Sequence, residues 1–478
     1  KYNKEFLLNL LFNEKLPSLC IGDIPDLEPF ELKIPPKQKH EITYEEYESL
    51  LENIFMIIDE YYKSNILKIK NYKFEKDLLK YVLEQVDEIY GDIIIEYNLD
   101  ENKIVNEALD LFYRINKCKR SYADSIIIKK QSEHIKQRID KLMVKYKEQE
   151  QPEQRTKAWY EFRWNLLTAS SIWKALDTQA SKNNLILGKC VPYEIKEYTV
   201  NVNSPFHNGH KYEPLSIMIY EDRFDTEVAD FGCMKHFKHN FIGASPDGIN
   251  VKRDNERYGR MVEIKNPVSR KLTGVPKTDY WVQMQLQMEV WDLDECDFYE
   301  TCFKEYETEE DFYNDGDEFN KTKDGKPKGI IVMFCGRKEP IYKYAPIGLS
   351  KDEYDKWYEN CLNENKHLTW FKNIFWYLKD ESLVLVTRNK LWFEEALPEF
   401  RVMWETIVKE RIEGYEHRKP KKRRLKVVKK PENISQISFS DSDFSDDDNK
   451  TDNIANKKIF KNENKNTNKK IFNTDNII

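Results

Sequence analysis

The sequence predicts an α/β core, in which a central mixed β-sheet is flanked by helices, between an all-α N-terminal region and a disordered C-terminal tail. Three observations predict this class. Apolar residues recur at helical spacing through residues 1–145, short apolar runs typical of strands occur between 146 and 417, and the composition changes sharply at Arg418. We therefore expect three parts: a helical accessory region (1–145), the core (146–417) and the tail (418–478).

Length and charge limit the possible functions. A chain of 478 residues can form two or three domains with a sizeable core. Its formal net charge is -7, although 34% of the residues are charged, so positive charge does not cover the whole molecule. Any contact with nucleic acid must come from a local basic patch. The sequence has no run of about eighteen apolar residues, so we expect no membrane span.

The eight cysteines are scattered and form no Cys-x-x-Cys pair. This spacing argues against zinc-finger, redox-motif and iron–sulfur interpretations, which need clustered thiolates. We expect free thiols in a reducing, intracellular compartment.

The N-terminal region carries three amphipathic stretches, at 41–65, 74–91 and 101–115. Each places apolar residues at helical spacing, which predicts three helices. A charged helix is expected from Gln131 to Gln149, and Pro152 then marks a break. No catalytic constellation occurs here. Binding of a partner and binding of DNA are both open roles for this accessory region.

The stretch from Gly243 to Pro267 is the centre of the predicted core. It suggests one strand through HNFIGAS into a Pro-Asp-Gly turn and a second strand, MVEIK. Side chains alternate along a strand, so Glu263 and Lys265 share one face. If the two strands pair, Asp247 lies beside Glu263. Two carboxylates and one ammonium then converge, and such oxygen ligands suit Mg²⁺.

Each of these pieces alone has an ordinary explanation. Pro-Asp-Gly is commonly a turn, because Pro presets φ and Gly accepts positive φ, and Glu-x-Lys on a strand is commonly solvated. Their joint occurrence in this order is more specific. S-P-D-G followed by E-I-K resembles the PD-(D/E)XK nuclease superfamily. More narrowly, it resembles the viral recombination exonucleases of the phage lambda exonuclease (YqaJ) type, and the abundant Lys, Asn, Ile and Tyr suit a giant-virus (mimivirus-like) member.

A second motif, W-Y-E-F-R followed by T-A-S, precedes this stretch. Thr168 suits the N-cap of a helix from Ala169 to Lys174, and Arg163 and Ser170 could face one anion. The ordinary alternative is a capped helix with a surface arginine. The resemblance, which spans roughly Glu153 to Ile407, implies that Arg163 and Ser170 hold the DNA phosphate near the cut.

Glu213 falls in a segment whose apolar spacing predicts a helix with Glu213 in or near its first turn. There it could simply complement the helix dipole. The spacing of Gly209 and Glu213, ahead of S-P-D-G, resembles the family position for a further acidic residue of the metal site.

A helix is expected in KTDYWVQMQLQMEVWDL, with Thr278 or Asp279 as its cap. The pair Gln283 and Gln287, one helical turn apart, favours this interpretation. Tyr-x-x-Gln at Gln283 resembles the family glutamine that completes the active site, and Gln285 could share the task. Solvation of the helix surface is the open alternative for these amides.

The rest of the core is expected to contain strands at 297–304 and 329–337, then helices at 353–378 and 392–412. We expect the aromatic residues of the last helix to be packing residues. Insertions at Asp177–Val202 and Glu305–Lys326 depart from the family pattern. The tail begins with the basic run KPKKRRLKVVKK, which is either a nuclear-localisation or DNA-tethering patch or a solvated linker.

The resemblance implies a metal-dependent deoxyribonuclease, more specifically a 5′-to-3′ exonuclease on linear double-stranded DNA in viral recombination, repair or genome processing. One or two Mg²⁺ or Mn²⁺ ions are expected at Glu213, Asp247, Glu263 and the carbonyl of Ile264. Lys265 would orient or deprotonate the attacking water with help from Gln283.

Two other functions are open from the sequence: a related endonuclease of nucleic-acid defence or end processing, and an inactive DNA-binding scaffold. The resemblance also implies a homo-oligomer, either dimer or trimer, and a single-strand-annealing protein or helicase as partner. The expected location is the viral factory or the host nucleus of an infected cell, or the virion.

Overall fold

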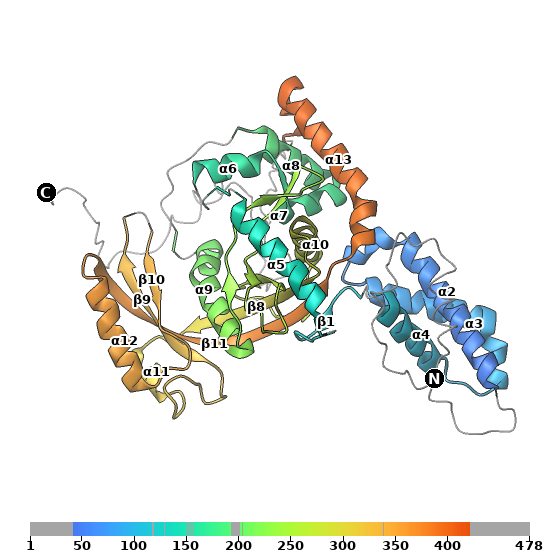
Figure 1. Ribbon diagram of the computed structural model, residues 1–478, viewed down its shortest axis with the longest axis horizontal. Helices are drawn as coiled ribbons and strands as arrows, with labels where there is room; N and C mark the ends of the chain where they lie inside the picture. The colour runs from blue at the N-terminus through green and yellow to red at the C-terminus, as the bar shows by residue number, and fades with distance from the viewer. Residues whose placement is uncertain are drawn as a thin grey trace, which may run out of the picture. The chain divides into compact units, whose positions relative to one another are not determined.

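The computed structural model describes residues 42–420, except for 117–118, 129, 150, 153, 155, 193–200, 203 and 338 (Figure 1). The predicted disorder of the tail, with its basic run from residue 421 on, lies outside the described residues. Within them, no helix combines the length and the apolar character needed to cross a bilayer. The six cysteines in this part of the chain form no disulfide.

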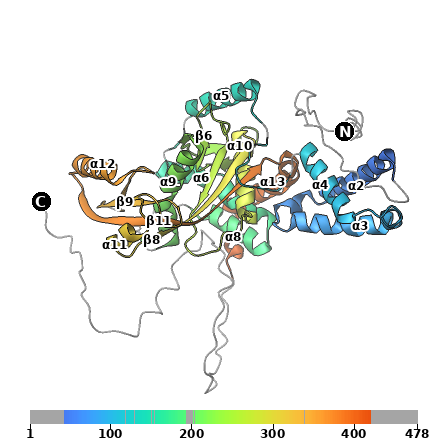
Figure 2. The same cartoon turned by 90° about the horizontal axis from the view of Figure 1, so that it is seen from below.

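Three helices near the N-terminus confirm the amphipathic stretches. They are α2 (Tyr44–Ser64), α3 (Phe74–Glu96) and α4 (Glu101–Asn116), with a 3₁₀ turn, η2 (Ile66–Lys70), after the first. They lie side by side in both views (Figures 1 and 2). Phe112 packs edge-on between the helices against Phe55, with ring centroids 5.4 Å apart. A capping box of Thr43 and Glu46 starts α2.

The N-terminal region is not entirely helical. A two-residue strand, β1 (Tyr122–Ala123), pairs antiparallel with a strand from the far end of the core. The predicted charged helix follows as α5 (Glu133–Glu148). The apolar core is continuous from α2 and α3 into the core helices, and Asn389 donates to the hydroxyl of Tyr62 at 2.7 Å. The accessory helices are therefore packed onto the core.

A mixed sheet of eight strands forms the centre. Seven run in the order β10-β9-β11-β8-β7-β6-β3, and β1 adds to β11. Only β7 and β8 are parallel among these described pairs. The bounds are β3 (Val228–Ala229), β6 (Gly248–Asn250), β7 (Met261–Lys265), β8 (Glu295–Glu305), β9 (Lys328–Cys335), β10 (Ile341–Tyr344) and β11 (Thr369–Thr387). The predicted α/β class with a mixed sheet is confirmed.

The prediction of a helix over 353–378 is wrong in its second half. The helix α12 spans only Lys351–Glu364, and the long strand β11 begins at Thr369. Ile374, Trp376 and Leu378 are buried at every second position, which is strand periodicity. β11 pairs with β9 along its first half and with β8 along its second half. This tertiary pairing decides the conformation of an aromatic-rich segment.

Helices cover both faces of the sheet (Figure 1). α9 (Pro205–Phe224) packs against one face, where Val262 and Ile264 of β7 contact it in one apolar cluster. α10 (Thr278–Trp291) and α13 (Lys390–Glu413) pack in the main cluster on the other face, with Met261 and Phe298. Trp392 of α13 is fully buried, so this aromatic residue packs as predicted. Glu263 points to the α10 face.

A second, three-stranded sheet has the order β2-β5-β4. Its strands are β2 (Leu167–Thr168), β4 (Met234–Lys235) and β5 (Ile242–Ala244), and α6 (Lys157–Trp164) and α7 (Ala169–Ile172) flank β2. β2 and β5 are parallel, with Thr168 opposite Gly243. The segments after both strands therefore leave this sheet at the same end.

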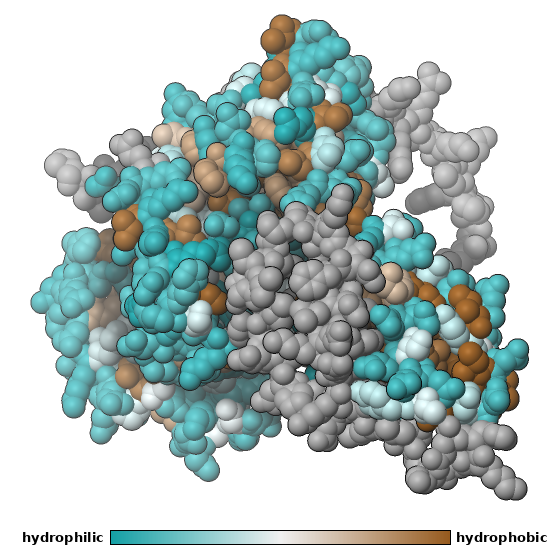
Figure 3. Space-filling view, turned by 45° about the vertical axis from the view of Figure 1, so that its right-hand side comes forward, coloured by the Kyte–Doolittle hydropathy of each residue, from teal (hydrophilic) through white to brown (hydrophobic). Residues whose placement is uncertain are grey.

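Two further helices lie in the two predicted insertions. α8 (Gln179–Cys190) follows η3 (Trp173–Leu176) in the first insertion. α11 (Glu309–Asn314) lies in the second, and η4 (Glu416–Arg418) ends the described chain. Exposed apolar residues on α3 include Ile89 and Ile95, and Figure 3 shows hydrophobic patches over the N-terminal helices within a largely hydrophilic face.

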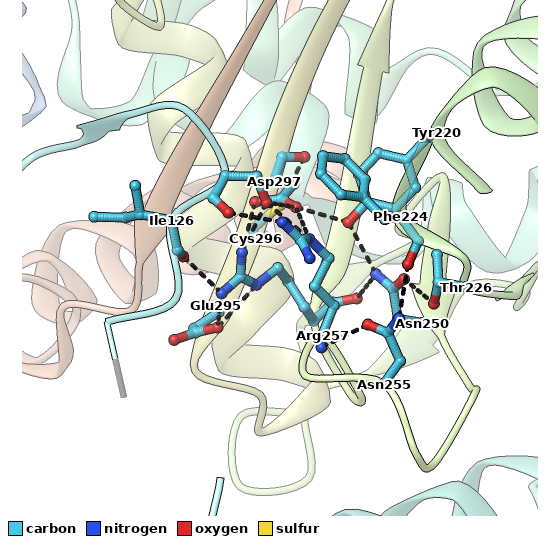
Figure 4. Close-up of polar contacts among 12 residues, drawn as sticks. Ile126, Tyr220, Phe224, Thr226, Asn250, Asn255, Arg257, Glu295, Cys296 and Asp297 are labelled. Carbon is cyan, nitrogen blue, oxygen red and sulfur yellow. Dashed lines mark hydrogen bonds and ion pairs between the residues drawn. The ribbon is translucent and has the colours of Figure 1, made fainter. Parts of the chain in front are cut away.

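A buried ionic cluster joins β8 to the connection between β6 and β7 (Figure 4). Asp297 accepts from the hydroxyl of Tyr220 at 2.6 Å and from Ser125 at 2.5 Å. Nη1 of Arg260 lies 3.2 Å from Asp297, and its Nη2 lies 2.6 Å from Glu295. The cluster thereby links three segments that are far apart in the sequence: the chain at Ser125, the β6–β7 connection and β8.

Candidate active site

Asp247 and Glu263 face each other across the β6–β7 hairpin. Gly248 pairs with Val262 in antiparallel register, so the preceding Asp247 lies opposite Glu263. The strand pairing differs from the prediction. Ile242–Ala244 belongs to the smaller sheet, and the partner of β7 is β6, which begins directly after Asp247. The predicted meeting of the two carboxylates is thus reached through a different strand pair.

The tetrapeptide Ser-Pro-Asp-Gly, which ends at Gly248, does not form the predicted turn with positive φ at its glycine. Gly248 lies within β6 and is not among the residues of the described chain that have positive φ. A Cβ at this position would lie 2.2 Å from Cγ1 of Val228 on the neighbouring strand. Glycine is required here for close strand packing, so the turn prediction for this residue is wrong.

Glu263 is fully buried and its carboxylate is surrounded by donors. Oε1 accepts from the ammonium of Lys265 and from Nε2 of Gln283 at 2.7 Å. Oε2 accepts from Nε2 of Gln287 at 2.6 Å. A buried charge persists only when it is paired and hydrogen-bonded in this way. The predicted shared face of Glu263 and Lys265 is confirmed by their ion pair.

Neighbouring charges perturb both titratable partners of Glu263. Burial and the carboxylates of Glu263 and Glu213 raise the pKa of Asp247 well above its ordinary value. Burial alone would lower the pKa of Lys265, but Glu263 and Asp247 hold that pKa above its ordinary value. Part of the Asp247 surface stays exposed, whereas Glu263 is fully buried, so solvent reaches this pair at Asp247. The site therefore carries crowded negative charge next to one ammonium.

Glu213 lies near this pair, but its position within its helix differs from the prediction. α9 begins at Pro205 with Ser204 as N-cap, so Glu213 falls in the middle of the helix. A role for Glu213 in complementing the helix dipole is wrong, because that effect is confined to the first turn. Pro214 follows it inside the helix. Its charge contributes to the raised pKa of Asp247, which places it in the same electrostatic site.

The glutamines of α10 divide between two roles. Gln283 and Gln287, one turn apart, bind the two oxygens of Glu263. Gln285 points elsewhere: it donates to the carbonyl of Thr387 at 2.9 Å and accepts from the N–H of Asn389 at 2.7 Å. The predicted helix is confirmed, but its N-cap is Lys277, so the predicted caps Thr278 and Asp279 lie inside the first turn.

Gln287 is the site residue that sequence reasoning missed. It also donates to the carbonyl of Ser245 at 3.1 Å, which fixes the segment leading to Asp247. The available signal was its spacing of four residues from Gln283, which puts both amides on one helix face. Ile264 contacts Asp247 through its backbone: its N–H donates to Oδ2 of Asp247 at 2.7 Å.

Arg163 and Ser170 also meet. Nη2 of Arg163 lies 3.5 Å from Oγ of Ser170, which is exposed. The parallel pairing of β2 with β5 directs Ser170 and Asp247 to the same end of the smaller sheet, and α7 packs against α10. The predicted helix from Ala169 to Lys174 is shorter than expected, since α7 ends at Ile172 and continues as η3. Thr168 is its N-cap, but its hydroxyl contacts Ser171.

The donor set fits a hard cation in composition. Among the described residues, no three His, Cys, Asp or Glu side chains stand in a ready-made metal-binding group. Asp247 and Glu263 nevertheless offer two opposed carboxylates, and a third, Glu213, lies close enough to help raise the pKa of Asp247. Oε2 of Glu263 accepts a single described hydrogen bond and so keeps a free lone pair. Oxygen donors with excess negative charge are what Mg²⁺ and Mn²⁺ require.

Comparison with known families identifies the segment that carries this site. Residues 158–294 match the family model described as the YqaJ-like viral recombinase domain. Arg163, Asp247, Glu263 and Gln283 all lie within this matched segment. The predicted family resemblance is confirmed.

Individual relatives are more distant. The chain is 30% identical over 298 residues to an uncharacterized protein of Acanthamoeba polyphaga mimivirus. The match covers 54% of this chain and 52% of that protein, so the chain spans about half the length of the curated relative it matches.

Two solved exonucleases are among the similar structures. An alkaline exonuclease (LHK-Exo) from Laribacter hongkongensis is 18% identical with a TM-score of 0.31, covering 54% of this chain and 94% of that one. A phage-related exonuclease from Haemophilus somnus is 12% identical with a TM-score of 0.28, covering 52% and 93%.

Proposed function

We propose that this protein is a metal-dependent deoxyribonuclease that hydrolyses DNA phosphodiester bonds, acting as a 5′-to-3′ exonuclease on linear double-stranded DNA during viral recombination, repair or genome processing. One observation carries the proposal: Asp247 lies opposite Glu263, whose carboxylate is held by Lys265 and Gln283. The YqaJ-like viral recombinase domain, over the same residues, supports it.

Asp247, Glu263 and the carbonyl of Ile264, with Glu213 nearby, would hold one or two Mg²⁺ or Mn²⁺ ions. A bound divalent cation polarises a phosphate and lowers the pKa of a bound water. The two glutamines of α10 keep the Glu263 carboxylate in one orientation, so its ligand geometry is set before substrate arrives. This pre-organisation is the contribution of α10.

Lys265 would act on the attacking water. In the absence of a cation its ammonium is paired with Glu263, and the nearby carboxylates favour its charged form. Positive charge placed at those carboxylates would remove this stabilisation, because opposite charges are what hold the lysine pKa high. Lys265 could then orient the water or accept its proton, a role worth about 10²–10⁴-fold in rate.

Arg163 and Ser170 would hold the phosphate beside the cut. A guanidinium and a hydroxyl separated by 3.5 Å offer two donor types to one anion, and Ser170 is accessible. Charge-assisted hydrogen bonds from arginine to phosphate are short and directional. The predicted DNA contact thus depends on this local pair, as the net negative charge of the chain requires.

The decisive experiment compares end-labelled linear duplex with closed circular plasmid, each with Mg²⁺ and with chelator. We expect loss of nucleotides from the ends of linear DNA only, and only with the metal. Cutting of the closed circle would favour the endonuclease. Cleavage that survives chelation, or no cleavage with either Mg²⁺ or Mn²⁺, would overturn the proposal.

A further inference from the structure

Three cationic residues converge at the C-terminal end of α6, where Arg163 lies. Nζ of Lys189, from α8, donates to the carbonyl oxygen of Arg163 at 2.7 Å. Arg411, from α13, donates through Nη2 to the carbonyl of Trp164 at 2.7 Å and through Nε to the carbonyl of Lys189 at 2.9 Å. Cations at the last carbonyls of a helix satisfy groups that lack intrahelical partners. The last turn of α6 is therefore held by two other helices, at Arg163 by α8 and at Trp164 by α13.

Ring stacking fixes the two arginines. The guanidinium of Arg411 lies 3.5 Å from the ring centroid of Trp164, and that of Arg163 lies 4.3 Å from the centroid of Trp159. The head of Arg163 is thus directed to Ser170 while its main chain is bound by Lys189. A movement of Lys189 would be transmitted directly to Arg163.

The cluster lacks counter-charge. In the part of the chain that the structure describes, neither Arg163, Lys189 nor Arg411 forms an ion pair with a carboxylate. The carboxylate next along α13, Glu410, is bound to Arg418 at 3.0 Å. Three cations without an anion predict that an external anion completes the group.

Lys189 is the member of this cluster that can lose its charge near neutrality. Burial of its ammonium, together with Arg163 and Arg411, lowers the pKa of Lys189 to about 7. The other titratable group that faces it is the thiol of Cys233, whose pKa is raised by burial, so it supplies no negative charge. Lys189 is partly exposed as a residue, and its Nζ lies 2.7 Å from the carbonyl oxygen of Arg163.

We propose that Lys189 is a positioning residue for Arg163 and that its protonation strengthens the hold on a DNA phosphate, so DNA binding is coupled to proton uptake at Lys189. This inference rests on the proposed function, because it assigns Arg163 to phosphate. A phosphate near the cluster favours the charged lysine, so affinity is greatest below pH 7 and falls as pH rises through neutrality. One charge acting over about 8 Å at intermediate dielectric gives about a 3- to 30-fold change in Kd.

The test measures binding, not cleavage. The full chain is titrated against a short blunt DNA duplex in chelator by fluorescence anisotropy, from about pH 6 to about pH 9. For the wild type we expect Kd to rise by the stated factor across this range. Lys189→Met should abolish the component centred near pH 7. Lys189→Arg should keep Kd low throughout, which a merely structural role would not produce.

Lys182→Met is the matched control, because Lys182 lies on the same helix and its ammonium is 3.7 Å from Glu399. It should keep the wild-type pH profile. If Lys189→Met and Lys189→Arg both retain that profile, the inference is overturned. DNA binding with the expected profile but no cleavage leaves the inference standing and removes the nuclease proposal, whereas no binding at any pH removes both.

Discussion

Glu263 determines which substitutions can separate catalysis from folding. Its buried carboxylate is held by one ammonium and two amides, and each donor comes from a different position: Lys265 from its own strand, Gln283 and Gln287 from α10. Removing a donor leaves a buried acceptor partly unsatisfied. Removing the carboxylate itself would disturb all three donors, so the donors are the better probes.

Lys265→Ala tests the proton-transfer role. We expect cleavage to slow by about 10²–10⁴-fold under single-turnover conditions with Mg²⁺. Affinity for DNA should change little, because Arg163 and Ser170, not Lys265, are the proposed phosphate contacts. Lys252→Ala is the control, since this lysine pairs with Asp225 at 2.6 Å on the surface. Full cleavage by Lys265→Ala would refute the assignment.

Gln287→Ala tests the missed member of the site. Losing its bonds to Glu263 and Ser245 should cost about 1–3 kcal/mol of unfolding free energy. It should also raise the Mg²⁺ concentration needed for half-maximal cleavage by about 10–100-fold, as loss of a ligand-orienting partner does.

Gln285→Ala is its counterpart on the same helix. It loses bonds to Thr387 and Asn389, so a similar loss of stability is expected with a normal Mg²⁺ requirement. Equal Mg²⁺ requirements in the two variants would show that Gln287 acts only in folding. Chemical denaturation and metal titration measure the two quantities.

The residues of the candidate site were more predictable than the contacts and helix positions that hold them in place. Strand alternation predicted the common face of Glu263 and Lys265, and the sequence order predicted that Asp247 would join them. The place of Glu213 within α9 was not predictable, because the apolar spacing does not reveal that Ser204 starts the helix nine residues earlier. Gln287 was visible as a helix neighbour of Gln283, but only the tertiary structure reveals that both reach one carboxylate.

Among the elements, the short strands were the hardest to predict. β5 and β6 are each three residues long and follow one another closely, yet they belong to different sheets. Only Ser245, Pro246 and Asp247 separate the two strands, and these three residues give no local indication that the chain changes sheets. The same limit explains β11, whose aromatic residues fit either period until β8 and β9 pair with it. Long amphipathic helices such as α2 were predictable from spacing alone.

Gly248→Ala tests the close packing of β6 against β3. The added methyl would overlap Val228, which is stiff at χ1, so one strand must move. We expect a loss of about 1–3 kcal/mol in unfolding free energy, with reduced cleavage because Asp247 is the adjacent residue.

Gly188→Ala provides the comparison for this substitution. Nothing lies within 4 Å of a Cβ at Gly188 in α8, so alanine should be neutral or stabilise the helix by about 1 kcal/mol. Thermal unfolding monitored by circular dichroism measures both. A Gly248→Ala protein as stable as the wild type would contradict the packing argument.

At the scale of the whole molecule, the ionic cluster around Asp297 connects the N-terminal linker to the sheet. Ser125 and Arg260 both bind Asp297, and Arg260 also donates to the carbonyl of Ile126 at 3.1 Å. Figure 4 shows these groups converging from β8, the β6–β7 connection and the linker. The accessory region is therefore attached to the sheet next to the β6–β7 strand pair, which carries the candidate active site.

A double-mutant cycle measures this attachment. Asp297→Leu should destabilise the protein by about 3–5 kcal/mol, because the buried guanidinium of Arg260 would lose its ion pair with Asp297. Asp297→Leu combined with Arg260→Met should cost clearly less than the sum of the single changes. Urea denaturation gives the three values, and strict additivity would show that the two charges are not coupled.

The long strand β11 also restricts how the chain can be shortened. Its first half is paired only through β9, which in turn carries β10. Excising residues between β8 and β11 would remove β9. The segment of β11 from Thr369 to Tyr377 would then lose the strand with which it forms backbone hydrogen bonds. Unpaired strand edges recruit other chains. A truncated protein lacking this hairpin should therefore self-associate, and any minimal catalytic fragment must keep it.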